Sequence, residues 1–236
     1  MNSKIISFSL WGDKPMYTVG AIENIQLARE LYPDWICRFY VDLSVPKVIV
    51  EKLLEEKAEI YQISDKKGLF WGMFWRFFAN DDENMDIFIS RDCDSRLSER
   101  ERVAVQEWED SDKLFHTMHD HYAHRSVPVL GGMWGAKKGC IKSMRDKVRG
   151  WRKYHAKGID QMFLWNEIWN DVKHTSINHS SLAKQHNVWA ETLPFPEHKA
   201  SRFGVKYVGE IFDEKNQPVL AKFEQIDYTA VLHKKP

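Results

Sequence analysis

The first 90 residues alternate short apolar runs with segments of helical periodicity, and this alternation constrains the fold more than any other feature. Apolar runs at 4–10, 35–41, 59–63 and 86–90 predict four strands. Helical spacing of apolar residues predicts helices at about 18–31, 46–57 and 69–80. An order of βαβαβαβ favours an α/β fold with a largely parallel sheet, because parallel neighbours need a crossover helix.

The chain departs from this alternation after residue 97. Ser98, followed three residues later by Glu101, is a capping-box start for a helix that reaches about Trp108. The remaining elements are expected as strands at 113–119, 127–136, 203–211 and 219–223 and helices at 141–153 and 160–172, with a polar loop at 120–126. No repeat or linker is evident, so residues 1–236 are expected to form a single domain with halves 1–97 and 98–236.

Composition argues against several functional classes. The 34 Lys and Arg residues equal the 34 Asp and Glu residues, so no global basic field favours nucleic acid, and phosphate recognition must be local. Three cysteines are too few and too scattered for a disulfide framework or a metal knuckle. No apolar run approaches the ~20 residues that span a bilayer. We therefore expect a cytoplasmic protein with no nucleic-acid partner and no transmembrane segment.

The predicted strand at 86–90 runs directly into Asp92 and Asp94. In an extended backbone, side chains two apart point the same way, so both carboxylates can face one divalent cation while Cys93 points elsewhere. Mg²⁺ and Mn²⁺ are usually bound through a few carboxylates plus substrate phosphates. Ligands of an open parallel sheet lie beyond the carboxyl ends of its strands. The pair predicts a metal and diphosphate site; the alternative is two acids that merely end a strand.

Three stretches resemble the nucleotide-sugar glycosyltransferases of the GT-A fold: the strand at 5–10, the run Phe74-Trp75-Arg76-Phe77, and the segment at 90–96 with its DxD motif. The chain looks most similar to the small single-domain enzymes of bacterial polysaccharide loci and large algal viruses. The resemblance implies a Rossmann-like GT-A fold, with a mostly parallel sheet flanked by helices. It also implies a hexose moved from a UDP- or GDP-linked sugar to a hydroxyl of a glycan or other acceptor, with Mn²⁺ or Mg²⁺ on Asp92 and Asp94.

The same resemblance implies residues that contact the donor. Residues expected against the nucleoside are Ser7, Phe8, Leu10 and Trp11. Residues expected near the diphosphate or donor sugar are Arg76, Arg91, Asp92, Cys93, Asp94, Gly132 and Trp134. A glycine permits close approach of backbone to sugar, and a tryptophan can stack on a sugar face. The alternatives are a surface role for the arginines and a glycine-marked bulge with a core tryptophan.

The sequence indicates the residues on the acceptor side less clearly than those that contact the donor. Asp160 opens a predicted helix where the family keeps either an acidic base or an acid that contacts the donor, although an Asp there also serves as a helix N-cap. Inverting and retaining chemistry therefore both stay open. Asp120 and His121 are expected to hydrogen-bond sugar hydroxyls on the acceptor side, so Asp120 is a second catalytic candidate. His198 is the candidate third metal ligand, by analogy with a histidine near the C-terminus of some GT-A enzymes.

Other functional classes share parts of this pattern. A sugar-phosphate nucleotidyltransferase would use the same metal and nucleotide, but it usually has a glycine-rich basic loop after the first strand, and residues 11–15 contain one glycine. A phosphatase of the haloacid-dehalogenase type carries its DxD after the first strand, with Thr or Val where this chain has Arg96. A non-enzymatic sugar-binding protein needs no paired carboxylates. Release of nucleoside diphosphate from a nucleotide sugar separates these classes.

Overall fold

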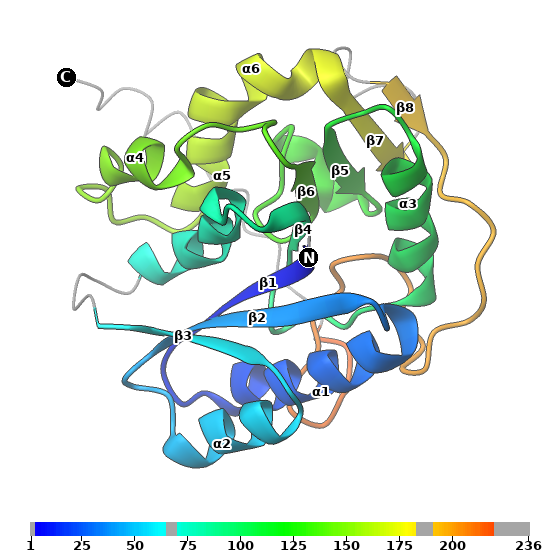
Figure 1. Ribbon diagram of the computed structural model, residues 1–236. Helices are drawn as coiled ribbons and strands as arrows, with labels where there is room; N and C mark the ends of the chain where they lie inside the picture. The colour runs from blue at the N-terminus through cyan, green and yellow to red at the C-terminus, as the bar shows by residue number, and fades with distance from the viewer. Residues whose placement is uncertain (1–2, 65–69, 183–190, 220–236) are drawn as a thin grey trace.

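Eight strands form one sheet in the computed structural model, which describes residues 3–64, 70–182 and 191–219 (Figure 1). Their order is β3-β2-β1-β4-β6-β5-β7-β8. Among the strands described, β6 alone runs antiparallel to its neighbours, β4 and β5. The strands are β1 Ser3–Leu10, β2 Trp35–Asp42, β3 Glu59–Ile63, β4 Met85–Ser90, β5 Phe115–His119, β6 Trp134–Lys137, β7 Ser176–Ser180 and β8 Glu191–Leu193.

Helices cover both faces of this sheet (Figure 1). The α-helices are α1 Pro15–Leu31, α2 Lys47–Glu55, α3 Glu99–Asp110, α4 Met144–Arg149, α5 Ile159–Phe163 and α6 Asn170–Val172. Tighter 3₁₀ segments are η1 Trp71–Asp81, η2 Tyr122–Ser126 and η4 Lys173–Thr175, and η3 Leu164–Trp169 is a π-helical segment. In the residues that the structure describes, no helix combines the length and the apolar character needed to cross a membrane.

Two hydrophobic cores lie on opposite faces of the sheet. Successive residues of a strand point to opposite faces, so Ile5 joins the core formed with η1 and α5, whereas Ile6 and Phe8 join the core formed with α1. The second core continues under α3 through Val105 and Trp108. Because β1 and β4 are buried on both faces, their sequences are nearly continuous apolar runs.

Most of the elements predicted for the first half are confirmed. The four strands and the helices at 18–31 and 46–57 lie where the apolar runs place them, and the sheet is mostly parallel. The Ser98 hydroxyl accepts a hydrogen bond from the Glu101 amide, so the predicted cap of α3 is confirmed as well. The helix expected at 69–80 is instead the 3₁₀ segment η1, and its expected first residue lies outside the described residues.

The second half differs from expectation in several elements. The apolar run at 127–136 becomes a strand only from Trp134, because Pro128 and the pair Gly131-Gly132 occur within the run. The helix expected at 141–153 is reduced to α4, and 160–172 forms α5, η3 and α6 in succession. The segment at 203–211 forms no regular strand, and 220–223 lies outside the described residues. Strand β7 was not predicted, since its sequence is polar.

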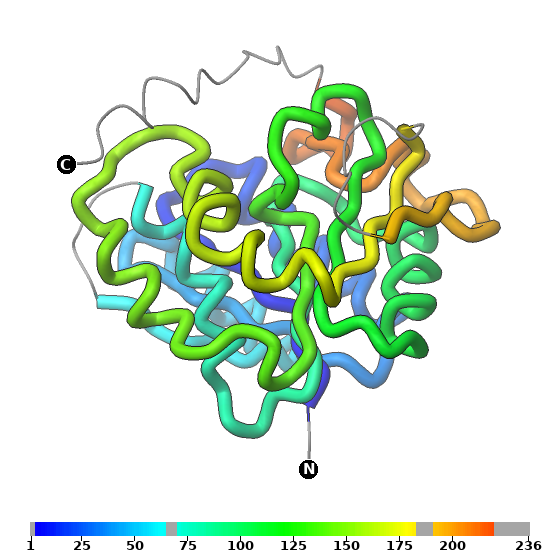
Figure 2. Tube along the Cα trace, turned by 90° about the horizontal axis from the view of Figure 1, so that it is seen from above, coloured from blue at the N-terminus to red at the C-terminus, as the bar shows by residue number. Residues whose placement is uncertain are grey.

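Residues 201–219 return to the middle of the molecule. Figure 2 shows this orange segment beside the green loop that follows β5. The Val208 amide donates to Asp120, and the Phe212 amide donates to the backbone carbonyl of Asp94, 2.8 Å away. A bridge between Ser95 and Ile211 lies beside that contact. The segment therefore connects the second half of the chain to the loop that carries the acidic pair.

Candidate functional site

The acidic pair lies where the strand order reverses. From β1 the chain crosses to β2 on one side, whereas β4 lies on the other side of β1 and pairs next with β6. Asp92 and Asp94 follow the carboxyl end of β4, directly beside the carboxyl end of β1. In open α/β sheets such a switch point leaves a crevice outside the strand ends, and ligands bind there. The acidic pair therefore lies at the strand ends, where the sequence analysis expected it.

Arg76 lies at the centre of this site and holds two carboxylates. Its Nη1 donates to Oδ1 of Asp92, and its Nη2 donates to Oδ2 of Asp160 over 2.9 Å. Arg76 and Asp160 are buried, whereas the Asp92 side chain is 44% exposed. Burial alone lowers the pKa of Arg76, but the charges of Asp92 and Asp160 outweigh it and raise that pKa. Residues 84 positions apart thus meet in one ion-pair network.

Two serines of β1 fix the backbone of Arg76. The Ser7 hydroxyl donates to the Arg76 carbonyl over 2.6 Å, and the Arg76 amide donates to the Ser9 hydroxyl over 2.9 Å. Side chains two apart in a strand share a face, so both serines reach the same peptide. Ser7, which was expected to contact the nucleoside, is buried and instead positions the arginine.

Gly131 and Gly132 bring backbone against both carboxylates. A Cβ on Gly131 would overlap Oδ2 of Asp160, and a Cβ on Gly132 would overlap Oδ2 of Asp92. The Ser90 hydroxyl holds this turn by donating to the Gly131 carbonyl over 2.7 Å. Only glycine allows so close an approach to these carboxylates; the approach to a sugar expected for Gly132 stays a prediction.

Asp94 and Tyr17 complete the charged side of the site. Burial and the neighbouring charge of Asp92 raise the pKa of Asp94 to about 7. Burial, followed by the charges of Asp94 and Asp92, raises the pKa of Tyr17 to about 12. Tyr17 lies in the first turn of α1. This helix can pack closely against the DxD loop because Gly20 has no Cβ; a Cβ there would overlap the Cys93 carbonyl. Sequence analysis missed Tyr17; its place just after the first strand was the available signal.

The residues present fit a divalent cation with a diphosphate. Among the described residues no three His, Cys, Asp or Glu side chains gather closely enough to hold a metal by themselves. Mg²⁺, however, is usually held by one or two carboxylates plus substrate phosphates and water, so Asp92 and Asp94 suffice. Oδ1 of Asp160 and Nε of Arg76 are buried without a hydrogen-bond partner in the structure described.

Three residues assigned to the donor site lie in the cores instead. Phe8 stacks on Phe39 with 4.7 Å between ring centroids, and Leu10 is buried beside it in the same core. Trp134 has no exposed surface and stacks on Phe115 at 5.3 Å, so it cannot cover a sugar face. The alternative of a core tryptophan beside a glycine turn is therefore the one found.

Other donor-site candidates are held by their own partners. Arg91 is buried, donates to Glu101 over 2.9 Å, and also donates to the backbone carbonyl of Ser90. The Cys93 thiol is buried against the Ser9 carbonyl, 3.4 Å away, and burial raises its pKa. Trp11 is half-buried and packs edge-on against Trp75, so part of its ring stays accessible at the end of β1.

Arg96 ties the DxD loop to the C-terminal segment. Its Nε donates to Asn216 over 2.8 Å, and its guanidinium lies 5.5 Å from the centre of the Phe212 ring. The Arg96 guanidinium thus has partners within the protein, and no ligand is needed to explain its position.

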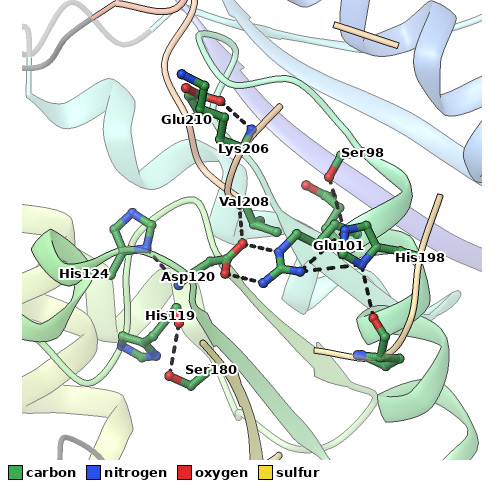
Figure 3. A network of polar contacts seen from close by, with 12 residues as sticks. Ser98, Glu101, His119, Asp120, His124, Ser180, His198, Lys206, Val208 and Glu210 are labelled. Atoms are coloured by element: carbon green, nitrogen blue, oxygen red, sulfur yellow. Dashed lines mark hydrogen bonds and ion pairs between the residues drawn. The ribbon is translucent and has the colours of Figure 1, made fainter. Parts of the chain in front are cut away.

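Asp120 and His198 belong to a different cluster (Figure 3). Both carboxylate oxygens of Asp120 accept from Arg100, at 2.5 and 2.7 Å, and Oδ2 also accepts from the Val208 amide. His198 is exposed and lies 3.5 Å from the Arg100 guanidinium, not in a three-ligand group with the acidic pair. Asp120 therefore connects α3, through Arg100, with the C-terminal segment, through Val208, and His198 contacts the same arginine.

Comparisons with known proteins identify the fold. No protein-family model and no curated protein sequence matches the chain. Three solved structures that it resembles are 4-diphosphocytidyl-2C-methyl-D-erythritol synthase from Anaerococcus prevotii, a glycosyltransferase involved in the glycosylation of the major capsid of PBCV-1, and core-mannan synthase A from Aspergillus fumigatus in a Mn/GDP form.

The first of these likenesses extends over almost the whole chain. It has 9% identity and a TM-score of 0.50, and it covers 99% of each chain. The PBCV-1 enzyme has 14% identity, covers 76% of this chain and 82% of its own, and has a TM-score of 0.49. The Aspergillus enzyme has 7% identity, covers 88% and 80%, and has a TM-score of 0.47. With its strand order and switch-point site, the chain has the GT-A nucleotide-diphospho-sugar transferase fold.

Proposed function

We propose that this protein is a metal-dependent glycosyltransferase that moves a hexose from a nucleotide-diphosphate sugar to a hydroxyl of a glycan or other acceptor. One observation carries the proposal: the buried pair of Arg76 and Asp160 keeps unpartnered polar atoms directly beside two carboxylates at the switch point. Buried polar groups are normally hydrogen-bonded, so unpartnered ones at a ligand-binding position indicate a bound polar substrate.

In the proposed reaction, the site residues around the acidic pair have different roles toward the diphosphate. Asp92 and Asp94 would hold Mn²⁺ or Mg²⁺, and such an ion would supply positive charge to stabilise the diphosphate leaving group. Arg76 places a fixed cation beside the same diphosphate, because both serines of β1 lock its backbone. Tyr17, in the first turn of α1, is near enough to Asp94 and Asp92 for their charges to raise its pKa, and it would lie beside the diphosphate.

Asp160 orients the donor sugar in this proposal. Its Oδ2 is engaged by Arg76, and its buried Oδ1 is available to accept a sugar hydroxyl. A base for the acceptor must reach the acceptor hydroxyl, and the burial of Asp160 behind Gly131 favours a contact with the donor instead. The N-cap of α5 is Gly158, and Asp160 is the second residue of the helix itself, so Asp160 is not the N-cap.

Release of nucleoside diphosphate from a panel of UDP- and GDP-hexoses tests the proposal. Wild-type protein with Mn²⁺ should release nucleoside diphosphate from at least one donor, and EDTA should stop the release. Asp94→Asn should abolish the metal-dependent rate while its far-ultraviolet circular dichroism stays unchanged. Release that persists in EDTA, or in Asp94→Asn, would contradict the assigned metal site.

Sugar-phosphate nucleotidyl transfer is the second candidate. It is favoured by the likeness to the Anaerococcus synthase, which spans almost the whole of both chains. Such an enzyme would consume a nucleoside triphosphate and a sugar phosphate and release pyrophosphate. The loop Trp11–Pro15 has a single glycine, which is poorly suited to cradle a triphosphate. Pyrophosphate release from such substrates, without hydrolysis or transfer of a nucleotide sugar, would select this candidate.

A further inference from the structure

The charge of this chain is balanced in total but segregated in space. Residues 142–157 contain seven Lys and Arg side chains and one acid, Asp146, although the whole chain has a formal net charge of zero. The remainder of the chain is therefore acidic. Six of the seven cations are exposed and form what we term the basic surface: Lys142, Arg145, Arg149, Arg152, Lys153 and Lys157.

Two cations of the basic surface lie over aromatic rings of η1. The Arg145 guanidinium lies 4.3 Å from the centre of the Phe78 ring, and the Arg152 guanidinium lies 4.5 Å from that of Trp71. These two rings are neighbours, with 6.3 Å between their centroids. α4 and the turn after it, which carry these cations, lie on one flank of the molecule, at the outer left in Figure 1.

Acids pair with some of the cations of residues 142–157 in the described part of the chain. Asp146 is exposed and pairs with Arg149 at 3.1 Å, and Asp171 lies 3.6 Å from the half-buried Lys147. Exposed pairs of this kind are weak and screened by salt. The surface therefore keeps a concentrated positive charge that would attract an extended anionic partner.

We propose that the basic surface docks the protein on an anionic membrane surface. A cluster of four to eight Lys and Arg residues on one face matches the charge of anionic lipid headgroups, and each cation near such a surface strengthens binding about fivefold. Docking of this kind needs no inserted apolar face. α4 has none to insert, because Met144 and Val148 point into the core.

Features of the surface disfavour nucleic acid. Single-stranded nucleic acid binds on exposed aromatic rings, whereas Trp71, Phe78 and Trp151 are all buried. Tyr154 is half-buried, with the Lys153 ammonium 5.3 Å from its ring centre. Duplex recognition places a helix in a groove, and α4 has six residues and packs its inner side on the core.

Co-sedimentation with vesicles tests the proposal directly. The full chain should bind phosphatidylcholine vesicles that contain about 30% phosphatidylglycerol at about 0.1 M NaCl, and about 0.5 M NaCl should release it. Vesicles of pure phosphatidylcholine should bind none. The quadruple variant K142Q/R149Q/K153Q/K157Q should bind anionic vesicles about a hundredfold more weakly or worse. It spares Arg145 and Arg152, which cover the aromatic rings.

A matched variant separates local from total charge. K47Q/K52Q/K199Q/K215Q removes four exposed lysines elsewhere and changes the net charge equally, so it should bind like wild type. Equal losses in the two quadruple variants, or no binding of the folded wild type to anionic vesicles, would overturn the proposal. So would tighter binding to a single-stranded RNA than to anionic vesicles at equal salt. None of these readouts depends on a transfer reaction.

Discussion

Two buried arginine–aspartate pairs of this molecule differ in how completely they are satisfied. In the pair of Arg100 and Asp120, both carboxylate oxygens accept from the guanidinium, and one also accepts from the Val208 amide. In the pair of Arg76 and Asp160, one contact of 2.9 Å joins the partners, and an oxygen and a nitrogen stay without partners among the described residues.

With the proposed function, this difference separates a brace from a binding site. A fully satisfied buried pair fixes two segments relative to each other and has no hydrogen-bonding capacity left for a ligand. A partly satisfied pair carries an energetic cost that a ligand can relieve. Both pairs are Asp with Arg, so the residue types alone could not distinguish them; their hydrogen-bond completeness does.

The largest expected effect is on catalysis through Asp160. Asp160→Asn should lower donor-dependent turnover about 10²–10³-fold, because one preorganised charged contact to the reacting region is lost. Burial raises the pKa of Asp160, and Arg76 keeps Asp92 as a charged partner in the variant, so the unfolding free energy should change by less than about 1 kcal/mol. Steady-state kinetics and urea unfolding measure the two quantities. Turnover retained within about threefold would place Asp160 outside the donor site.

The second effect is on stability through Asp120. Asp120→Asn should lower the unfolding free energy by about 2–3 kcal/mol, since Arg100 loses its charged partner in a largely buried setting. Where the variant is folded, its turnover should stay within about fivefold of wild type. Asp146→Asn, at an exposed pair, is the matched control and should cost less than about 0.5 kcal/mol. If Asp120→Asn lost activity and not stability, the roles assigned to the two pairs would be reversed.

A third effect comes from the glycine turn. Gly132→Ala should displace the Asp92 carboxylate and weaken donor use about tenfold in kcat/KM, because its Cβ has no room beside Oδ2. Gly150→Ala is the control, since the nearest atom to its Cβ would be 3.8 Å away. Equal activity of the two variants would show that the close approach at Gly132 is not needed.

A further expected effect is a pH dependence of stability that comes from buried histidines of the second half. All ten histidines follow residue 115, and burial lowers the pKa of His116 and lowers that of His124 to about 3. Each stays neutral in the fold but is protonated in the unfolded chain below about pH 6.5, so stability falls as the pH drops. The slope is about 1.4 kcal/mol per pH unit for each such histidine.

Unfolding free energies between about pH 6.5 and 4 test this dependence. His124→Gln should reduce the slope, whereas His155→Gln, at an exposed position, should leave it unchanged. A slope that His124→Gln does not alter would mean that this histidine is protonated in the folded protein as well.

The elements of the first half were predictable because they depend on local patterns. Strands buried on both faces are continuous apolar runs, and the acidic pair follows one of them directly. Strand β7 was not predictable in this way, because its buried His179 and Asn178 are satisfied by partners on other elements, such as His116 and Thr117. Local sequence does not show such long-range partners.

The same limit applies within the site. Arg76, Asp92 and Asp160 were each singled out, but their meeting across 84 residues could not be derived from spacing. Arg91 was expected near the diphosphate, but in the fold it is buried and donates to Glu101. Trp134 was expected to stack on a sugar, but it lies inside the core. Residue type suggested the chemistry, and tertiary packing decided which residues remain available for it.

Anomalous scattering from Mn²⁺ tests the central claim most directly. In crystals grown with Mn²⁺ and UDP or GDP, a single strong peak should lie between the carboxylates of Asp92 and Asp94, bonded to the diphosphate, with Arg76 beside it. A peak bound elsewhere, or nucleotide bound without Mn²⁺ at these two carboxylates, would contradict the account.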